Sequence, residues 1–276
     1  MRKLVKVALV AALSAGLVAC SSGSKESDDK TIRVGASPVP HAQILNEAVA
    51  DALKEEGYTL EVIEFEDYVL PNTSLEEEEI DANYFQTLTY MNNENESRGL
   101  HLVASTGVHI EPMGVYSQKY KDIKDIPDGA EITIPNDEDN RDRAVQFLIA
   151  QGLLNETDNY SAVAINGNDE VNPHNYVLAE VEAASLPRTL EDVDASVING
   201  NYALGANLPE KAPALVIEEF DEETSIKRTN FIVVKEGNED SDKTKALVKA
   251  INSDTVKKYI ENTYKGSVIP SFIDPQ

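Results

Sequence analysis

From about residue 31 onward, short β-rich runs alternate with segments whose apolar residues repeat at helical spacing. Residues 31–35 are typical of a strand, 44–53 of an amphipathic helix that ends before Gly57, and 60–65 of a second strand. This alternation predicts the α/β class, in which helices cover a mostly parallel sheet. The same patterns predict strands at 102–108, 113–116, 131–135, 195–198 and 231–234, and helices at 71–79, 87–98, 243–252 and 254–264.

A charged, turn-rich stretch interrupts the alternation at residues 117–129, and a strand and a helix follow it. Such a stretch is typical of a connection between two lobes. The chain beyond its first 30 residues is long enough for one large domain or for two smaller ones. We therefore expect the first lobe to end at about Ser117.

The single cysteine, Cys20, follows Leu17, Val18 and Ala19 at the end of an apolar run that begins behind a basic N-terminus. The run is shorter than the ~20 residues that cross a bilayer, and it ends in small residues, so it indicates a lipoprotein export signal. We expect residues 1–19 to be removed, Cys20 to carry lipid, and the polar residues 20–30 to act as a flexible tether. An ordinary secretory signal that happens to end in cysteine is the alternative.

These features predict a protein at the extracytoplasmic face of the cell membrane, attached through its lipid alone. The formal charge is −25, and loss of Arg2, Lys3 and Lys6 with the signal changes it to −28. Nucleic acids and anionic lipid faces repel such a surface, so nucleic-acid binding is excluded. Because no heptad pattern or spare apolar stripe is visible, we expect a soluble monomer once the lipid is absent.

Several chemistries lack their sequence signals. The histidines, His41, His101, His109 and His174, form no H-x-x-H or H-x-H pair, and no second cysteine is available for a zinc set. The nucleophile-elbow, phosphate-loop and dinucleotide-binding glycine motifs are also missing. The sequence therefore predicts no metal site, no cofactor and no catalytic residue, and the chain is not expected to be an enzyme.

Five segments, in order and in register from about residue 31 to 270, carry a family resemblance. They are VGASPVPH at 34–41, FEDYVLPN at 65–72, IDANYFQ at 80–86 with Tyr90 soon after, PND at 135–137 with Asn140 and Arg143, and LPR at 186–188 with VINGNY at 197–202. Together they resemble the NlpA or MetQ family of lipoproteins, the methionine-binding components of ABC importers. The resemblance implies a type II periplasmic-binding-protein fold, with two α/β lobes, two crossovers and the ligand in the cleft between the lobes.

With this fold, the expected first lobe comprises residues 31–117 and about 225–276, and the second lobe residues 118 to about 204. The second crossover is expected at about 205–224. The resemblance also implies an ABC permease and its ATPase as partners.

A closed site for a free amino acid must satisfy a carboxylate and an ammonium group, because burying either charge unpaired is costly. Arg143 is expected to bind the carboxylate, beside Asn140 at the start of a helix that Asp139 or Asn140 can cap. Asn199 and Asn201 follow a buried strand and offer acceptors to the ammonium. Without the resemblance, the sequence would favour a solvated helix arginine at Arg143 and a simple turn at 199–201.

Tyr68, Phe85 and Tyr90 are expected to form the apolar wall, since aromatic rings pack well against a thioether. Plain core packing is the alternative for these rings.

Family members that bind methionine usually have histidine and proline where this chain has Thr87 and Thr89. The ligand is thus expected to be methionine or a similar small amino acid, with another apolar amino acid or a short peptide as the alternative. A lipid-anchored adhesin is the competing function of another class.

Overall fold

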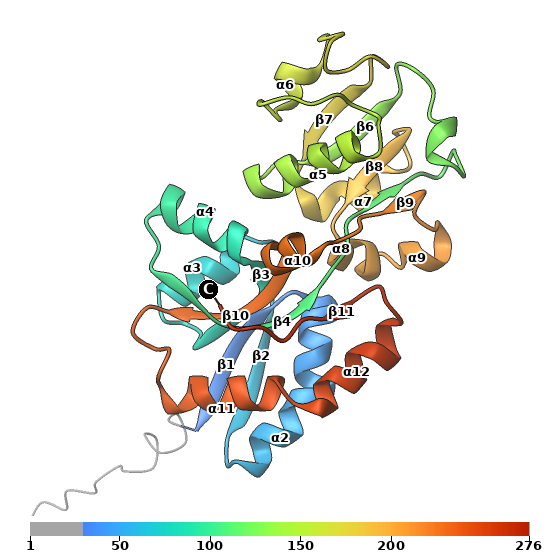
Figure 1. Ribbon diagram of the computed structural model, residues 1–276. Coiled ribbons are helices and arrows are strands. Elements are labelled where there is room, and N and C mark those ends of the chain that lie inside the picture. Colours follow the sequence, from blue (N-terminus) through green and yellow to red (C-terminus); the bar gives the residue numbers. More distant parts are fainter. Residues whose placement is uncertain (1–29, 276) are drawn as a thin grey trace, which may run out of the picture.

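Two α/β lobes, each built around its own sheet, make up the computed structural model, which describes residues 30–275 (Figure 1). The signal, Cys20 and most of the expected tether lie outside the described residues. The expected α/β class with two lobes is confirmed. Among residues 30–275, no helix is both long and apolar enough to cross a membrane.

The first lobe holds a six-stranded sheet with the order β11-β4-β10-β3-β1-β2. β1 is parallel to β2 and β3, whereas β10 runs antiparallel to β3 and β4. The two strands that flank β1 therefore end at the same edge of the sheet as β1. The last residues of β3 lie at the interface between the lobes. The strands are β1 (Thr31–Ala36), β2 (Thr59–Glu64), β3 (Ala82–Thr87), β4 (Leu102–Ile110), β10 (Thr229–Lys235) and β11 (Ile269–Pro270).

Helices cover both faces of this sheet. On one face, apolar side chains such as Leu45, Leu247 and Ile260 form a single core with Val34 and Ile232 of the sheet. They come from the helical segment of η1 (Pro38–Ala42), η2 (Leu45–Val49) and α2 (Ala50–Glu55), and from α11 (Asp242–Ile251) and α12 (Asp254–Tyr264). On the other face, α3 (Leu70–Glu76) and α4 (Leu88–Arg98) pack over β4 and β10.

The second lobe holds a five-stranded sheet with the order β7-β6-β8-β5-β9. Its core contains Ile132 and Ile134 of the sheet and Ala144 and Leu148 of the helix that follows. The strands are β5 (Gly114–Tyr116), β6 (Glu131–Pro135), β7 (Val177–Val181), β8 (Ala195–Ile198) and β9 (Val216–Ile217). The helices are η3 (Ile123–Asp125), α5 (Glu138–Ala150), α6 (Ala162–Ile165), η4 (Ala183–Ser185), α7 (Leu186–Thr189), α8 (Gly200–Gly205) and α9 (Leu208–Lys211).

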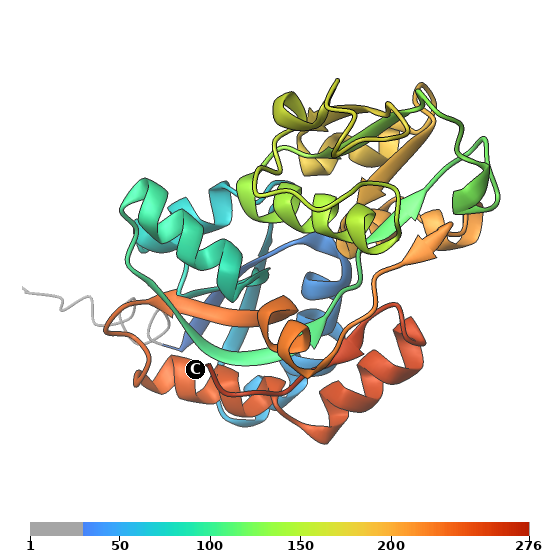
Figure 2. The same ribbon diagram turned by 45° about the horizontal axis from the view of Figure 1, so that its top comes forward.

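The chain passes between the sheets twice, after Ile110 and after Ile217, and Figure 2 shows both connections running side by side. The first crossing precedes the expected boundary at Ser117, because β5 hydrogen-bonds to β8 and β9 of the second sheet. The second crossing is shorter than the expected 205–224. It begins only after α9 and β9, and α10 (Glu222–Arg228) already packs against α4 of the first lobe. The charged stretch 117–129 is thus a surface connection within the second lobe.

Candidate ligand-binding site

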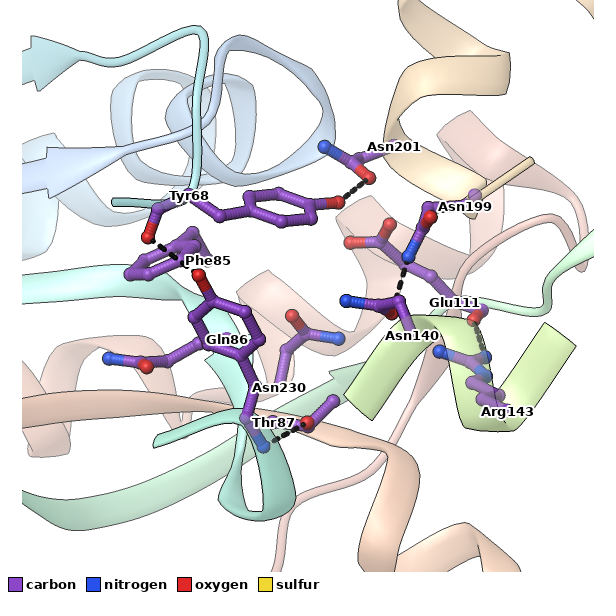
Figure 3. Close-up of a pocket in the computed structure, with 12 residues that line it drawn as sticks. Tyr68, Phe85, Gln86, Thr87, Glu111, Asn140, Arg143, Asn199, Asn201 and Asn230 are labelled. Atoms are coloured by element: carbon purple, nitrogen blue, oxygen red, sulfur yellow. Dashed lines mark hydrogen bonds between the residues drawn. The ribbon is translucent and has the colours of Figure 1, made fainter. Parts of the chain in front are cut away.

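A pocket that is partly open to solvent lies between the lobes (Figure 3). Its walls come from the segment before α3, the ends of β3 and β8, the start of β10, the N-terminal parts of α4, α5 and α8, and the first crossover. This position is the usual place for ligands in α/β proteins. The structure brings together all eight residues that the sequence predicted for the site: Tyr68, Phe85, Thr87, Tyr90, Asn140, Arg143, Asn199 and Asn201.

Three aromatic rings form the first-lobe wall. The ring centroid of Tyr68 lies 5.7 Å from those of Phe85 and Tyr90, and Tyr202 of the second lobe lies 5.0 Å away on another side. The Tyr68 hydroxyl donates a 2.6 Å hydrogen bond to Asn201 Oδ1, and the Tyr90 hydroxyl donates to the Tyr68 carbonyl at 3.1 Å. Burial raises the pKa of the Tyr68 hydroxyl, so it remains a neutral donor. The wall is therefore apolar at its centre, with its hydroxyls already bonded.

Thr87 has a structural role as well as a place in the pocket. It is the residue before the first turn of α4, and its Oγ1 accepts a hydrogen bond from the Tyr90 backbone N–H at 3.3 Å. Its hydroxyl also lies 3.1 Å from that of Thr89. Threonine here therefore caps the helix that carries Tyr90.

Asn140 and Asn199 form a buried pair across the second lobe. Asp137, rather than Asp139 or Asn140, caps α5, and its Oδ1 accepts from the Asn140 backbone N–H at 3.0 Å and side-chain Nδ2 at 2.8 Å. Asn140 Oδ1 then accepts from Asn199 Nδ2 at 2.7 Å. Asn199 Oδ1 is buried and has no donor among residues 30–275. It is therefore an acceptor that the pocket leaves open.

Arg143 is buried, and its charge is already matched. Its Nε lies 3.1 Å from both carboxylate oxygens of Glu218, in the second crossover, and its Nη2 donates to the Glu111 carbonyl at 2.9 Å. Burial works to lower the pKa of Arg143, but the neighbouring carboxylates, Glu218 first and then Asp139 and Glu111, together outweigh burial and raise the pKa. The sequence predicted Arg143 as the partner of a ligand carboxylate. That role stays a prediction, with Nη1 as the part of the guanidinium that Glu218 leaves available.

Sequence reasoning missed four residues that also line the pocket: Gln86, Glu111, Gly200 and Asn230. Gln86 stands inside a segment that was singled out, and its amide bonds to the buried Asn72 at 2.6 Å. Gly200 packs tightly on the first crossover, since a Cβ there would lie 2.8 Å from Glu111 Cβ and 2.9 Å from the Pro112 carbonyl oxygen. Glu111 was one of many carboxylates, and no local signal marks Asn230.

Glu111 belongs to a buried cluster with two histidines at the base of the pocket. Its Oε1 lies 2.7 Å from His109 Nε2 and 3.1 Å from His41 Nε2, and Tyr84 Oη lies 2.5 Å from His109 Nδ1. Burial lowers the pKa of His41 to about 4 and that of His109 to about 3, so both rings are neutral at pH 7. The ligand atoms of His41, His109 and Glu111 lie within 4.8 Å of one another. No metal site was predicted from the sequence, because His41 lies far from His109 and Glu111 along the chain.

Comparisons with known proteins agree with the architecture. A sequence profile of the NlpA lipoprotein family matches residues 32–272, which confirms the resemblance carried by the five segments. The methionine-binding lipoprotein MetQ of Bacillus subtilis is 38% identical over 98% of this chain and 99% of its own length.

Two solved structures are similar over most of the chain. A nutrient binding protein from Burkholderia cenocepacia, bound to methionine, is 36% identical with a TM-score of 0.77, covering 87% of this chain and 100% of that one. The substrate binding protein of a methionine transporter from Streptococcus pneumoniae is 33% identical with a TM-score of 0.79, covering 88% and 96%. The expectation of a binding protein rather than an enzyme agrees with these names.

Proposed function

Because the chain belongs to the NlpA lipoprotein family, we propose that it is the substrate-binding protein of an ABC importer and delivers methionine or a closely related amino acid to the permease and its ATPase. It works at the extracytoplasmic face of the cell membrane, anchored through lipid on Cys20, and its folded part is a monomer. It carries out no chemical reaction. The names of its relatives support this role, since they describe methionine-binding lipoproteins and a transporter component.

The observation that carries this proposal is the division of the pocket between an apolar and a polar wall. Tyr68, Phe85 and Tyr90 present ring surface from the first lobe, and Asn140, Arg143 and Asn199 present polar groups from the second. A small amino acid has the same division between its side chain and its charged main-chain groups. Aromatic rings also make favourable contacts with a thioether sulfur, which supports methionine among the apolar amino acids.

Arg143 and Asn199 suit the two charges of such a ligand. The Arg143 guanidinium keeps Nη1 for a carboxylate, and the orphaned Asn199 Oδ1 can accept a hydrogen bond from an ammonium group. Because a buried acceptor without a donor costs free energy, a ligand that supplies the donor gains affinity. Asn201 Oδ1 already accepts from Tyr68, so it is less available to a ligand ammonium than Asn199 Oδ1.

A thermal-shift screen of the lipid-free protein against the amino acids and their dipeptides tests the proposal. A ligand present at 100 times its Kd stabilises the folded state by about 2.7 kcal/mol, and at equal concentration the tightest ligand stabilises it most. We therefore expect methionine to raise the melting temperature more than the other compounds do. A larger shift with another apolar amino acid or a dipeptide would favour the alternative ligands. No shift with any of them would favour the adhesin and contradict the proposal.

Replacing Thr87 with histidine should raise affinity for methionine relative to other amino acids by about tenfold at most, the contribution of one hydrogen bond. The reason is that methionine-binding relatives usually have histidine here. Because Thr87 caps α4, the same change should cost about 1 kcal/mol of stability. Calorimetry on Thr87→His measures the first effect, and Thr87→Ser, which keeps the cap, is the control. Unchanged selectivity in Thr87→His would show that this position does not select methionine.

A further inference from the structure

We propose that the Glu111 carboxylate is the anionic group of the cleft and selects ligands that carry an ammonium group. This inference rests on the proposed function, and it names the residue that would make an amino acid, rather than the corresponding carboxylic acid, the preferred ligand. None of the predicted site residues has this role.

Glu111 is placed to meet a ligand. It follows β4 directly, in the first crossover, and it lines the pocket although it is only 7% exposed. Figure 3 shows its side chain running from the crossover toward the amides of Asn199 and Asn201. The carboxylate therefore stands beside the open acceptor of Asn199, and a ligand ammonium could contact both groups.

The hydrogen bonds around Glu111 favour its charged form. His41 Nε2 faces two acceptors, Glu111 Oε1 and Asn230 Oδ1, each at 3.1 Å, so this nitrogen carries the proton. The Asn201 backbone N–H also donates to the carboxylate. With the Tyr84 hydroxyl donating to His109 Nδ1, His109 Nε2 supplies a third donor at 2.7 Å. Three donors around one carboxyl group favour the carboxylate form, whereas burial, the larger effect, raises the pKa of Glu111. A ligand cation beside the carboxyl group would therefore favour its ionised form.

None of these donors brings a positive charge. Both histidines are neutral at pH 7, since burial lowers their pKa values to about 4 and about 3. Arg143 contacts only the backbone carbonyl of Glu111 and forms its ion pair with Glu218, so its charge acts on the Glu111 carboxylate without a direct contact. A buried anion that no cation contacts is costly, so an occupant that brings a cation into contact gains free energy from it.

An ammonium group fits this position better than a metal ion does. A metal ion needs the lone pairs of the histidine Nε2 atoms, but in this network those nitrogens hold protons that point at Oε1. The position of Arg143 also favours an amino acid as the ligand. Its Nη2 donates to the backbone carbonyl of Glu111 at 2.9 Å, so the cationic group of the cleft lies close to the residue that carries the anionic group. An α-amino acid carries its two charges on neighbouring carbons and can reach both.

The test compares two ligands on three proteins by calorimetry in buffer with EDTA. The ligands are L-methionine and 4-methylsulfanylbutanoate, the same acid without its ammonium group, and the proteins are the parent, Glu111→Gln and Glu66→Gln. Glu66 is exposed, so its variant has the same change in charge without a change in the buried cluster. We expect Glu111→Gln to weaken methionine binding roughly 10- to 100-fold and binding of the butanoate less than about threefold. Glu66→Gln should match the parent.

The outcomes separate this inference from the function on which it rests. Equal losses for both ligands in Glu111→Gln would make Glu111 a structural residue, and no loss would place the ammonium elsewhere; either result overturns the inference. Methionine binding by the parent only after zinc is added would overturn it in favour of a metal. A parent that binds no amino acid at all would contradict the proposed function itself. If circular dichroism shows that Glu111→Gln is unfolded, Glu111→Asp, which keeps the charge but withdraws it, should give an intermediate loss for methionine alone.

Discussion

Replacing Arg143 with alanine should weaken methionine binding by roughly 30-fold to several thousand-fold, the equivalent of ~2 to 5 kcal/mol. The ligand carboxylate would lose its charged partner in a site that largely excludes water. The same change should also lower the free energy of unfolding by about 1 to 3 kcal/mol, because Glu218, which is 13% exposed and still accepts from the Met113 backbone N–H, loses its cationic partner. Calorimetry measures the affinity, and circular-dichroism melting curves measure the stability.

The pairing of Arg143 with Glu218 makes a double variant the decisive control. Arg143→Ala combined with Glu218→Ala removes both charges, so it should recover part of the lost stability without recovering affinity. Arg141→Ala is the matched control, since Arg141 lies on the same helix and pairs with its neighbour Asp142 rather than lining the pocket. Binding by Arg143→Ala as tight as that of the parent would show that the carboxylate is held elsewhere.

The strands and helices predicted best are those whose patterns depend on one buried face. β6, β8 and α12 have the bounds that the sequence predicts, because 131–135 and 195–198 are continuous buried runs and 254–264 is an amphipathic repeat behind a serine cap. β7 was not predicted, and its side chains are mostly half-buried or exposed at the edge of the sheet. β9 and β11 have two residues each, too few to form a pattern.

The first crossing shows where composition misleads. Residues 117–129 are charged and rich in turns, so they resemble a linker, but the chain changes lobes a few residues earlier, at 111–113. That boundary is set by pairing between β5 and β8, which lie about 80 residues apart in the sequence. Such non-local pairing leaves no local mark on the sequence.

The site shows the same limit. Arg143 and Asn199 were found because they stand in segments that resemble a family, and the structure brings them into one pocket. Their partners could not be found in that way. The sequence has 49 acidic residues, and only tertiary packing shows that Glu218 reaches Arg143 and that Glu111 lies beside His41 and His109.

The folded state should lose stability as the pH falls from about 6.5 toward 4.5, and His41 and His109 should cause much of the loss. Burial lowers the pKa of His41 to about 4 and that of His109 to about 3, whereas unfolded histidines titrate near 6.5. Between these values the unfolded chain binds more protons, so acid favours unfolding by up to about 1.4 kcal/mol per pH unit for each ring. Burial raises the pKa of Glu111, which acts in the opposite direction and offsets part of this loss.

Melting curves by circular dichroism from pH 7.5 to 4.5 measure this dependence in the parent, His109→Gln and His101→Gln. Glutamine at position 109 can still donate to Glu111 and accept from Tyr84 but cannot take up a proton, so the slope of stability against pH should become distinctly shallower in this variant. His101 is exposed and pairs with Glu76, so His101→Gln measures how far the loss of an exposed histidine changes the slope, for comparison with the buried His109. Parallel curves for the parent and His109→Gln would mean that His109 does not titrate on unfolding. His109 would then take up its proton near pH 6.5 in the folded protein as well, and below that pH Glu111 would have a cationic neighbour before any ligand arrives.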